Sequence, residues 1–363
     1  MTRREEEILK LLREDPLISQ KALAEKLGVE RASVASYISQ LMKKGFIKGK
    51  GYILNSPKYC LIIGNSYVNI VARPKDNLRL YEENIGFVEI ELGGTGRNTA
   101  VYANELGEEV RLLSAFAGDV NGKKMKKDLK ERGIDFALSY EDGNVGSCMK
   151  LSVVDENGHM EIQVSQMDLI NGITEGYIRK NKGAIINANK LVLDARLNFD
   201  TVECICNIKS NKTPILFNMS IAEKSVQFRP LTKKFDTIVL RKVEAEVLLG
   251  IKIKNYQDLR NGINRILKDG VRRVVMPLNE DGIIYATNTS IYKGKSLNSI
   301  PVTSKAKEKI LAALLVLDKY ELKIERQVAG LCKIMEMRET ELKDFDKLIN
   351  GLEFEKMFEI KEI

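Results

Sequence analysis

The stretch Leu92-Gly93-Gly94-Thr95-Gly96-Arg97-Asn98-Thr99-Ala100 carries the strongest signal for the fold in this sequence. Closely spaced glycines favour a tight turn, because a residue without a Cβ atom reaches backbone conformations that are closed to other residues. They also let the backbone approach a polyhydroxylated ligand, whose hydroxyls Asn98 could then bind at the start of a helix. The stretch therefore predicts a strand-to-helix turn, either with a ligand or as a plain turn.

Around this turn, apolar runs typical of buried strands alternate with amphipathic helical segments. The runs are Cys60–Ile63, Leu191–Leu193, Pro214–Phe217, Thr237–Leu240 and Val274–Met276, and the helical segments lie near 98–106, 121–132, 173–188, 243–249 and 255–268. Such alternation predicts an α/β fold with a mostly parallel sheet covered by helices on both faces. Residues 71–92 and 145–165 interrupt it with short alternating strands, which predict a small separate sheet over one edge.

The first part of the chain has a different pattern. Helical segments are predicted at 4–14, from Ser19 to Gly28, and at 30–44, where an apolar stripe of Val34, Ile38 and Leu41 faces inward. Residues 46–48 and 52–54 then predict a small β-hairpin. Three short helices and a terminal hairpin form the winged helix-turn-helix pattern.

One face of the third of these helices suits contact with duplex DNA. Residues 20–29, Gln-Lys-Ala-Leu-Ala-Glu-Lys-Leu-Gly-Val, resemble the helix-turn junction of bacterial transcription regulators. In such a domain small and amide side chains reach base edges in the major groove, while lysines neutralise phosphates. The candidate DNA-binding residues are Arg31, Ser33, Ser36, Gln40, Lys43, Lys44, Lys48 and Lys50. A protein–protein module with a solvated basic face is the alternative.

Length and charge support two domains. A chain of 363 residues exceeds the ~250–300 residues that one core usually supports, so we predict a winged-helix domain at 1–56 and a larger domain at 57–363. Residues 1–55 hold 11 Lys and Arg against 7 Asp and Glu, a balance of +4 out of +8 for the whole chain. This excess suits a polyanionic partner, although solvated helix faces alone could produce it.

The cysteines and the apolar runs indicate the cellular compartment in which the protein functions. Its five cysteines are scattered and odd in number, which does not suggest a disulfide framework, and the pair Cys204 and Cys206 has too few soft ligands nearby for a zinc site. The first residues lack the apolar stretch of a signal peptide, and no run approaches the ~18 apolar residues of a membrane span. We therefore predict a cytoplasmic protein with no membrane partner and no structural metal.

Several motifs occur in a fixed order along the larger domain. They are residues 92–100, Gly118-Asp119-Val120-Asn121-Gly122, Gly133-Ile134-Asp135, Met167–Thr174, and Val243–Glu246 ahead of Leu248-Leu249-Gly250. This ordered set resembles the ribokinase-like PfkB family of carbohydrate kinases, most closely its pseudouridine kinase branch, over residues 58–350. The resemblance implies a three-layer α/β/α sandwich with a small β lid formed by 71–92 and 145–165.

The resemblance also implies a substrate site. In the family the first glycine turn contacts the sugar, which makes Gly93, Gly94 and Asn98 candidate substrate residues here. Family members carry Asn and Asp two residues apart after the first strand, where this chain has Tyr67 and Asn69. An Asp-to-Asn change keeps a hydrogen-bond acceptor but loses the charge. An altered site for a sugar or nucleoside is therefore expected.

The start of a late helix departs further from the family. Members have Gly-Ala-Gly-Asp there, where backbone N–H groups stabilise the transferring phosphate and the Asp takes the proton from the substrate. The glycines correspond to Lys305 and Lys307 here, the base corresponds to Glu308, and Ser304 precedes them as a candidate anion-binding residue. The two lysines could bind an anion by direct charge, or they could be solvated with no role.

Two further elements of the nucleotide site are changed. The family's Lys-Pro-Asn is Val239-Leu240-Arg241 here, so that only Glu244 remains of the phosphate and magnesium site. The Thr/Ser-Leu-Gly turn that holds nucleotide phosphates is Pro277-Leu278-Asn279. The resemblance therefore implies a kinase-like domain with an impaired ATP site.

Three functions fit these observations. The leading prediction is a DNA-binding transcriptional regulator whose kinase-like domain binds a sugar or nucleoside and uses no cofactor. The runner-up is an active kinase that uses ATP and Mg²⁺, with Glu308 as base and the winged helix as an accessory. The third is an interaction module in which both sites are idle. Because winged helices of this kind usually read two half-sites, we also predict a homodimer.

Overall fold

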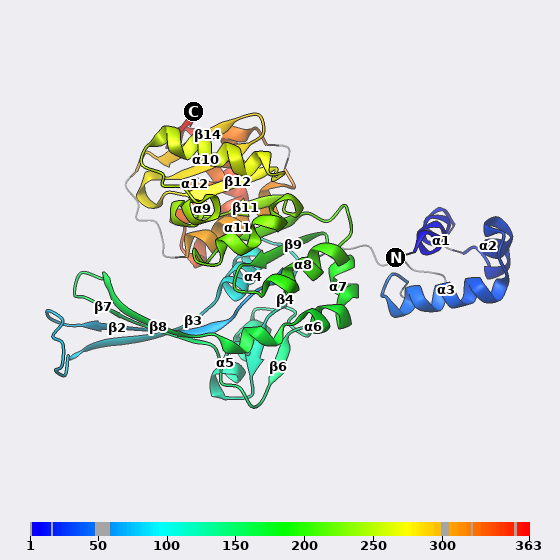
Figure 1. Cartoon of the computed structure of the whole chain (residues 1–363), viewed down its shortest axis with the longest axis horizontal. Coiled ribbons are helices and arrows are strands. Elements are labelled where there is room, and N and C mark those ends of the chain that lie inside the picture. Colours follow the sequence, from blue (N-terminus) through cyan, green and yellow to red (C-terminus); the bar gives the residue numbers. More distant parts are fainter. Residues whose placement is uncertain (1, 16, 48–58, 299–304, 321, 352–353) are drawn as a thin grey trace.

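Three helices at the start of the chain enclose a small apolar core (Figure 1). The computed structural model describes every residue except 1, 16, 48–58, 299–304, 321 and 352–353. The helices are α1 (Arg3–Glu14), α2 (Gln20–Leu27) and α3 (Arg31–Lys43). The predicted stripe of Val34, Ile38 and Leu41 points into this core. Of the predicted wing hairpin, Phe46 and Ile47 are described and are buried in this core, and the rest lies outside the described residues.

The predicted helix ends are confirmed. The Ser19 hydroxyl accepts a hydrogen bond from the Ala22 amide at 3.1 Å and caps α2, and Gly28 ends the helix at φ 63°. A left-handed residue at this place satisfies the last carbonyl groups, and glycine reaches that conformation without steric cost. The turn between α2 and α3 is thus fixed by local sequence.

A nine-stranded sheet forms the centre of the larger domain, in the order β15-β14-β13-β12-β11-β10-β9-β1-β4. Neighbouring strands from β4 to β12 pair in parallel, and the three strands beyond β12 are antiparallel. The strands are β1 (Cys60–Ile63), β4 (Val110–Leu113), β9 (Lys190–Asp194), β10 (Ile215–Asn218), β11 (Thr237–Val239), β12 (Arg273–Pro277), β13 (Ile283–Thr287), β14 (Ile291–Ser296) and β15 (Phe358–Glu362).

Both faces of this sheet are buried, because consecutive residues of a strand point to opposite sides. Leu61 and Ile63 of β1 enter one apolar core, and Cys60 and Ile62 enter the other. The first core is covered by α6 (Glu175–Lys180), α7 (Lys182–Ile186), α8 (Phe199–Ile208), η2 (Ser225–Lys234), α9 (Lys242–Leu249) and α10 (Tyr256–Lys268). The second is covered by α4 (Thr95–Glu105), α5 (Val120–Glu131), α11 (Ala306–Leu317), α12 (Ile324–Glu336) and α13 (Phe345–Ile349).

The three-layer α/β/α arrangement confirms the fold class. One detail differs: the helix predicted at 173–188 is two helices, α6 and α7, that break at Asn181, whose amide donates to the Tyr177 carbonyl at 3.1 Å. Short connecting elements complete the domain. They are β5 (Ala115–Ala117), β6 (Tyr140–Asp142), η1 (Asp168–Gly172), η3 (Asn279–Asp281), η4 (Glu339–Asp344) and η5 (Phe354–Met357).

A separate four-stranded sheet, which we call the lid, extends away from the body of the domain (Figure 1). It arises from the two segments that interrupt the β/α alternation, although its first strand begins earlier than predicted. Its strands, in the order β3-β2-β7-β8, are β2 (Tyr67–Pro74), β3 (Gly86–Gly93), β7 (Met149–Val154) and β8 (Met160–Gln166).

The two faces of the lid differ in chemistry. Asn69 pairs in register with Glu91 on one side and Lys150 on the other, so that polar side chains share one face. The next residue of each strand lies on the opposite face. That face consists of Val68, Ile70, Ala72, Val88, Ile90, Leu92, Met149, Leu151, Val153, Ile162, Val164 and Gln166. It carries no charge, and several of its side chains are exposed, Ile90 at 58% and Val164 at 62%.

The lid meets the body where the backbone of Gly94 passes the end of β1. Gly94 has φ 113°, and a Cβ atom there would lie 2.3 Å from the Asn65 carbonyl oxygen. The side-chain oxygen of Asn65 accepts from the Thr95 amide at 2.9 Å, and its carbonyl accepts from the Arg97 amide at 3.2 Å. Gly94 is thus required by close contact with the chain's own backbone.

The N-terminal helices contact the larger domain at α7. The Asn187 amide donates to the Lys44 carbonyl, at the end of α3, at 3.3 Å, and to the Gly183 carbonyl at 2.8 Å. Ile186 packs against the apolar core of the three helices. In the described part of the chain, no helix is long and apolar enough to cross a membrane.

Candidate functional site

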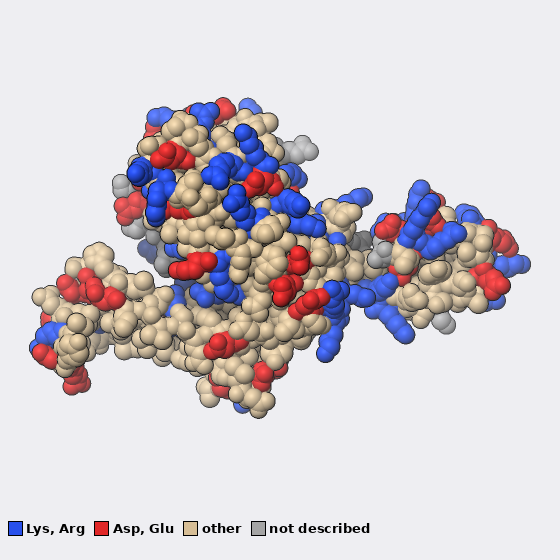
Figure 2. Space-filling model, viewed as in Figure 1, with Lys and Arg blue, Asp and Glu red and all other residues tan. Residues whose placement is uncertain are grey.

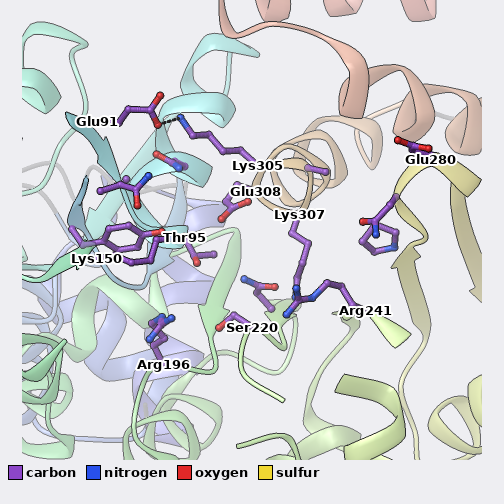
Figure 3. Close-up of a pocket in the computed structure, with 18 residues that line it drawn as sticks. Glu91, Thr95, Lys150, Arg196, Ser220, Arg241, Glu280, Lys305, Lys307 and Glu308 are labelled. Carbon is purple, nitrogen blue, oxygen red and sulfur yellow. Dashed lines mark hydrogen bonds and ion pairs between the residues drawn. The ribbon is translucent and has the colours of Figure 1, made fainter. Parts of the chain in front are cut away.

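One pocket brings together most of the predicted ligand residues (Figure 3). It has a volume of about 470 Å³ and lies between the polar face of the lid and the carboxyl ends of β9 and β10. A cavity of this size suits a small ligand, and the carboxyl ends of parallel strands are where α/β proteins usually bind one. The lining residues are Tyr67, Asn69, Glu91, Gly93, Thr95, Asn98, Lys150, Arg196, Asn218, Ser220, Arg241, Pro277, Asn279, Glu280, Lys305, Ala306, Lys307 and Glu308.

The predicted residues divide into three groups. Seven of them line the pocket, namely Tyr67, Asn69, Gly93, Asn98, Lys305, Lys307 and Glu308. Gly94 and Glu244 do not line it: Gly94 contacts the end of β1, and Glu244 is fully buried behind the pocket wall. Ser304 lies outside the described residues. The contact of Gly94 with a ligand stays a prediction.

The lid side of the pocket offers hydrogen-bonding groups. The side-chain oxygen of Asn69 is buried and has no hydrogen-bond partner. The side-chain oxygen of Asn98 accepts from Arg97 at 2.8 Å, which leaves its NH₂ group for a ligand. Burial raises the pKa of Tyr67 to about 12, and the charge of Glu308 acts in the same direction, so the phenol stays a donor. Such groups are suited to hydroxyls.

Glu308 lies in the first turn of α11, whose start faces the pocket. The next residues of this helix, Lys309–Leu317, are buried in the core under the sheet, and this packing fixes the direction in which the helix begins. Burial raises the pKa of the Glu308 carboxyl, against the lowering effect of Lys307. A carboxyl group of this kind is a possible proton acceptor when its pKa approaches the working pH.

Glu244 is saturated by two cations of the chain. Its Oε1 accepts from Arg241 Nη2 at 2.7 Å and Nε at 3.0 Å, and its Oε2 accepts from the Arg241 amide at 2.6 Å and from Lys307 Nζ at 2.9 Å. Lys307 also donates to the Met219 carbonyl at 2.7 Å. Burial lowers the pKa of Lys307, and Glu244 opposes this effect.

This arrangement does not fit a magnesium ion. A divalent cation needs carboxylate oxygens with free lone pairs, directly or through water, and both oxygens of Glu244 already accept two donors. Lys307, which the resemblance aligns with a glycine of the family, brings its own positive charge to this acid. Among the described residues, no group of three or more His, Cys, Asp and Glu side chains is arranged to hold a metal.

Two other features alter the side of the pocket where members of the family bind the nucleotide. Lys305 forms an ion pair with Glu91 of β3 at 3.0 Å, which links the start of α11 to the lid. Asn279 keeps the left-handed conformation of a glycine turn, at φ 56°, but Glu280 follows it in the pocket lining and would repel nucleotide phosphates. Pro277 lacks the hydroxyl of the family residue.

Three charged residues of the pocket lining could not be predicted from the sequence motifs. Glu91, Lys150 and Arg196 belong to no motif in the sequence, and only the strand register and the end of β9 place them at the pocket. Alternation along the lid strands could have suggested that Lys150 shares a face with Asn69, but not which face is turned to the pocket.

The candidate DNA-binding face is exposed on α3. Arg31, Ser33, Ser36, Gln40 and Lys43 are all solvent-exposed. Figure 2 shows lysines and arginines grouped on parts of the N-terminal helices, with acidic residues elsewhere on the same domain. Positive charge beside exposed small and amide side chains is what an interface with duplex DNA requires.

The predicted role of Lys44 in DNA binding conflicts with its position in the structure. Its ammonium forms an ion pair with Glu5 of α1, whose side chain is fully buried, and so it holds the three helices together. Nearby charge on Lys44 and a hydrogen bond from Thr2 lower the pKa of Glu5 despite the opposing effect of burial. Lys44 is therefore not free for a phosphate contact. Lys48 and Lys50 lie outside the described residues.

Comparison with known proteins decides the family. Residues 58–305 match the model of the pfkB family of carbohydrate kinases. The chain belongs to the pfkB family. Residues 1–48 match a winged helix-turn-helix DNA-binding model, so this pfkB protein carries a winged helix-turn-helix domain ahead of its kinase-like domain.

Relatives of this pfkB protein include sugar and nucleoside kinases. The uncharacterized sugar kinase YeiI of Escherichia coli is 25% identical over 78% of each chain. The pseudouridine kinase of the same organism is 26% identical over 63% of this chain and 72% of its own. Arabidopsis thaliana ribokinase, solved with ribose and ATP, superposes with a TM-score of 0.67 at 14% identity, over 81% of this chain and 99% of its own. The ribokinase-like fold is thereby confirmed.

We predict that Lys307→Met lowers the free energy of unfolding, because it leaves an oxygen of the buried Glu244 without its cation. A buried acceptor that loses its partner typically costs about 1–3 kcal/mol. Lys305→Met is the matched control: its pair with Glu91 is partly exposed on both sides, and such pairs are worth about 1 kcal/mol or less. Chemical denaturation of both variants checks this, and an equal loss in the two would contradict the buried pair.

Proposed function

We propose that this pfkB protein is a DNA-binding regulator whose kinase-like domain binds a sugar or nucleoside without phosphorylating it. The observation that carries the proposal is the saturation of Glu244 by Lys307 and Arg241. Both cations stand at positions where the family has other residues, and together they neutralise the one acid that remains of the magnesium site. Binding of the ligand is supported by the hydrogen-bonding groups that Tyr67, Asn69 and Asn98 present in the pocket.

Three losses act together against phosphoryl transfer. The transferring phosphate develops charge that the metal and a turn of backbone N–H groups normally stabilise. Lysines at 305 and 307 lack the conformational freedom that lets several N–H groups converge on one oxygen. Glu280 adds a negative charge beside the place of the nucleotide phosphates. ATP and Mg²⁺ are therefore not cofactors under this proposal.

A second function has one observation in its favour. Glu308 lies in the pocket at the position of the family base, and burial raises its pKa in the direction that suits a proton acceptor. An active kinase would use ATP and Mg²⁺ and would treat the winged helix as an accessory. Turnover separates the two functions.

We also propose a homodimer that forms through the apolar face of the lid. The end of this face near the body is covered, with Val68 buried, but Val88, Ile90, Leu151, Ile162 and Val164 are exposed in the single chain, and four strands contribute uncharged side chains to the face. A charge-free face is complementary to a second copy of itself, because neither copy has to desolvate an ion. Two winged helices in one particle would then read two half-sites of an operator.

The first expected outcome concerns turnover. Purified protein with ATP and Mg²⁺ should release no ADP above background over a panel of sugars and nucleosides, because the loss of one phosphate-binding donor alone typically lowers the rate by ~10²–10³. Steady-state ADP release measures this. Mg²⁺-dependent turnover that disappears in Glu308→Gln would reject the regulator without kinase activity and establish the active kinase.

The second expected outcome concerns DNA binding. On random-sequence duplex DNA, Lys43→Ala should reduce the slope of log affinity against log salt by about 0.9, the value for one phosphate contact. Lys268→Ala is the matched control, since Lys268 is exposed on α10 of the larger domain, away from the N-terminal helices, and it should leave this slope unchanged. Gln40→Ala should keep the slope and relax sequence preference in a selection from random duplexes. If neither lysine variant changed the slope, the proposed contact between α3 and the DNA phosphates would be contradicted.

The third concerns assembly. Sedimentation velocity should show a dimer for the natural chain and a monomer for Ile90→Glu, which places a charge in the centre of the apolar face. Ile90 is 58% exposed in the single chain, so its folding should tolerate this change. Glu89→Gln, on the opposite face of the same strand, should remain a dimer. A monomeric natural chain, or a dimeric Ile90→Glu, would rule out the lid as the interface.

A further inference from the structure

Two cations in the pocket have no carboxylate partner. Lys150 on β7 lines the pocket from its lid side, Arg196 lines it from the end of β9, and both are half-buried (Figure 3). Within the described ranges neither takes part in an ion pair, whereas Lys305 and Lys307 are paired with Glu91 and Glu244. Glu308, which lines the same pocket, acts on Lys150 through its charge but forms no ion pair with it in the described part of the chain.

The two cations stand close enough to oppose each other. Burial lowers the pKa of Lys150 and the charge of Arg196 lowers it further, whereas the charge of Glu308 opposes this shift. The Lys150 ammonium lies 5.3 Å from the centre of the Tyr67 ring, a cation–π contact that holds it in place instead of letting it move to solvent. An anion between Lys150 and Arg196 would offset both the burial and the repulsion.

Neutral polar groups adjoin Lys150 and Arg196, which together we call the cationic corner of the pocket. Asn69 pairs in register with Lys150, and its buried side-chain oxygen has no partner of its own. A buried acceptor without a donor is costly, and a ligand hydroxyl would satisfy it. The NH₂ group of Asn98 is also available. The ligand that suits the corner therefore carries an anionic group close to hydroxyls.

We propose that the pocket recognises the phosphate monoester of a sugar or nucleoside, with the phosphate bound between Lys150 and Arg196. A phosphate monoester carries about −1.5 to −2 charges at neutral pH, which matches two cations, while a carboxylate would balance one. The guanidinium adds a planar pair of donors that fits phosphate oxygens. This inference rests on the proposed function, since it names the ligand class of the same pocket.

The chemistry of such a ligand places the protein in a reaction sequence. A phosphorylated sugar or nucleoside is the product of a phosphotransferase or a kinase, and this chain would sense that product instead of making it. Occupancy could pass to the DNA-binding helices through the contact of Asn187 and Ile186 with the N-terminal domain.

The test is ligand-induced stabilisation of the full-length chain. Its Tm is measured at constant ionic strength with ribose 5-phosphate against ribose, uridine 5′-monophosphate against uridine, inorganic phosphate, and gluconate as a carboxylate. We expect a phosphorylated probe to raise Tm more than its neutral parent, because only binding to the folded state is stabilising. Inorganic phosphate should also stabilise at millimolar concentration, and gluconate should do so less.

Variants locate the effect. Lys150→Met and Arg196→Met should each weaken phosphate binding about tenfold or more, the loss expected for one charged hydrogen bond. Lys150→Arg should retain binding and serves as the variant that keeps charge and fold. Arg73→Met is the matched control, since Arg73 lies on the same lid face but outside the pocket lining.

Equal shifts with phosphorylated and neutral probes would overturn the inference, as would equal losses in Arg73→Met and Lys150→Met. A larger shift with gluconate than with either phosphate ester would assign the corner to carboxylates and overturn it as well. The absence of any shift with all phosphate probes has the same consequence. None of these outcomes affects the turnover or DNA measurements, so the failure of the ligand class is distinguishable from the failure of the regulator.

Discussion

The contact between Gly94 and the end of β1 is the constraint on which the pocket depends. The backbone of Gly94 passes so close to the Asn65 carbonyl that no side chain fits, and Asn65 in turn binds the amides of Thr95 and Arg97. One asparagine thereby fixes where the lid strand β3 ends and where α4 begins. The floor of the pocket, the hinge of the lid and the helix that presents Asn98 all follow from this junction.

A second interaction gives the domain its altered chemistry. In an active site of this family an acid near the transferring phosphate has to remain available, whereas here Glu244 is enclosed by Lys307 and Arg241. A buried acid with two cations is stable only while all three remain. Under the proposed function, Lys307 and Arg241 take the place of a metal ion at Glu244. Lys150 and Arg196, which form no ion pair in the described part of the chain, lie elsewhere in the pocket lining.

Much of this could be predicted from the sequence, because it rests on local signals. Short stretches of the chain determine the helix caps at Ser19 and Gly28. They also determine the alternation of buried strands with helices and the two interruptions that form the lid. The ion pairs are not, because their partners are far apart: Lys307 and Glu244 are 63 positions apart, and Lys44 and Glu5 are 39. Residue types alone could not distinguish a glycine that meets ligand from Gly94, which meets backbone.

The alternation of the lid strands limits how the lid can change in evolution. Side chains alternate with a period of two, so the insertion or deletion of one residue within β2 or β7 exchanges the two faces. Ile70 and Leu151 would then point toward the ligand, and Lys150 would point away from it. Length variation should therefore be confined to the connections at residues 75–85 and 155–159, while the strands themselves keep their lengths.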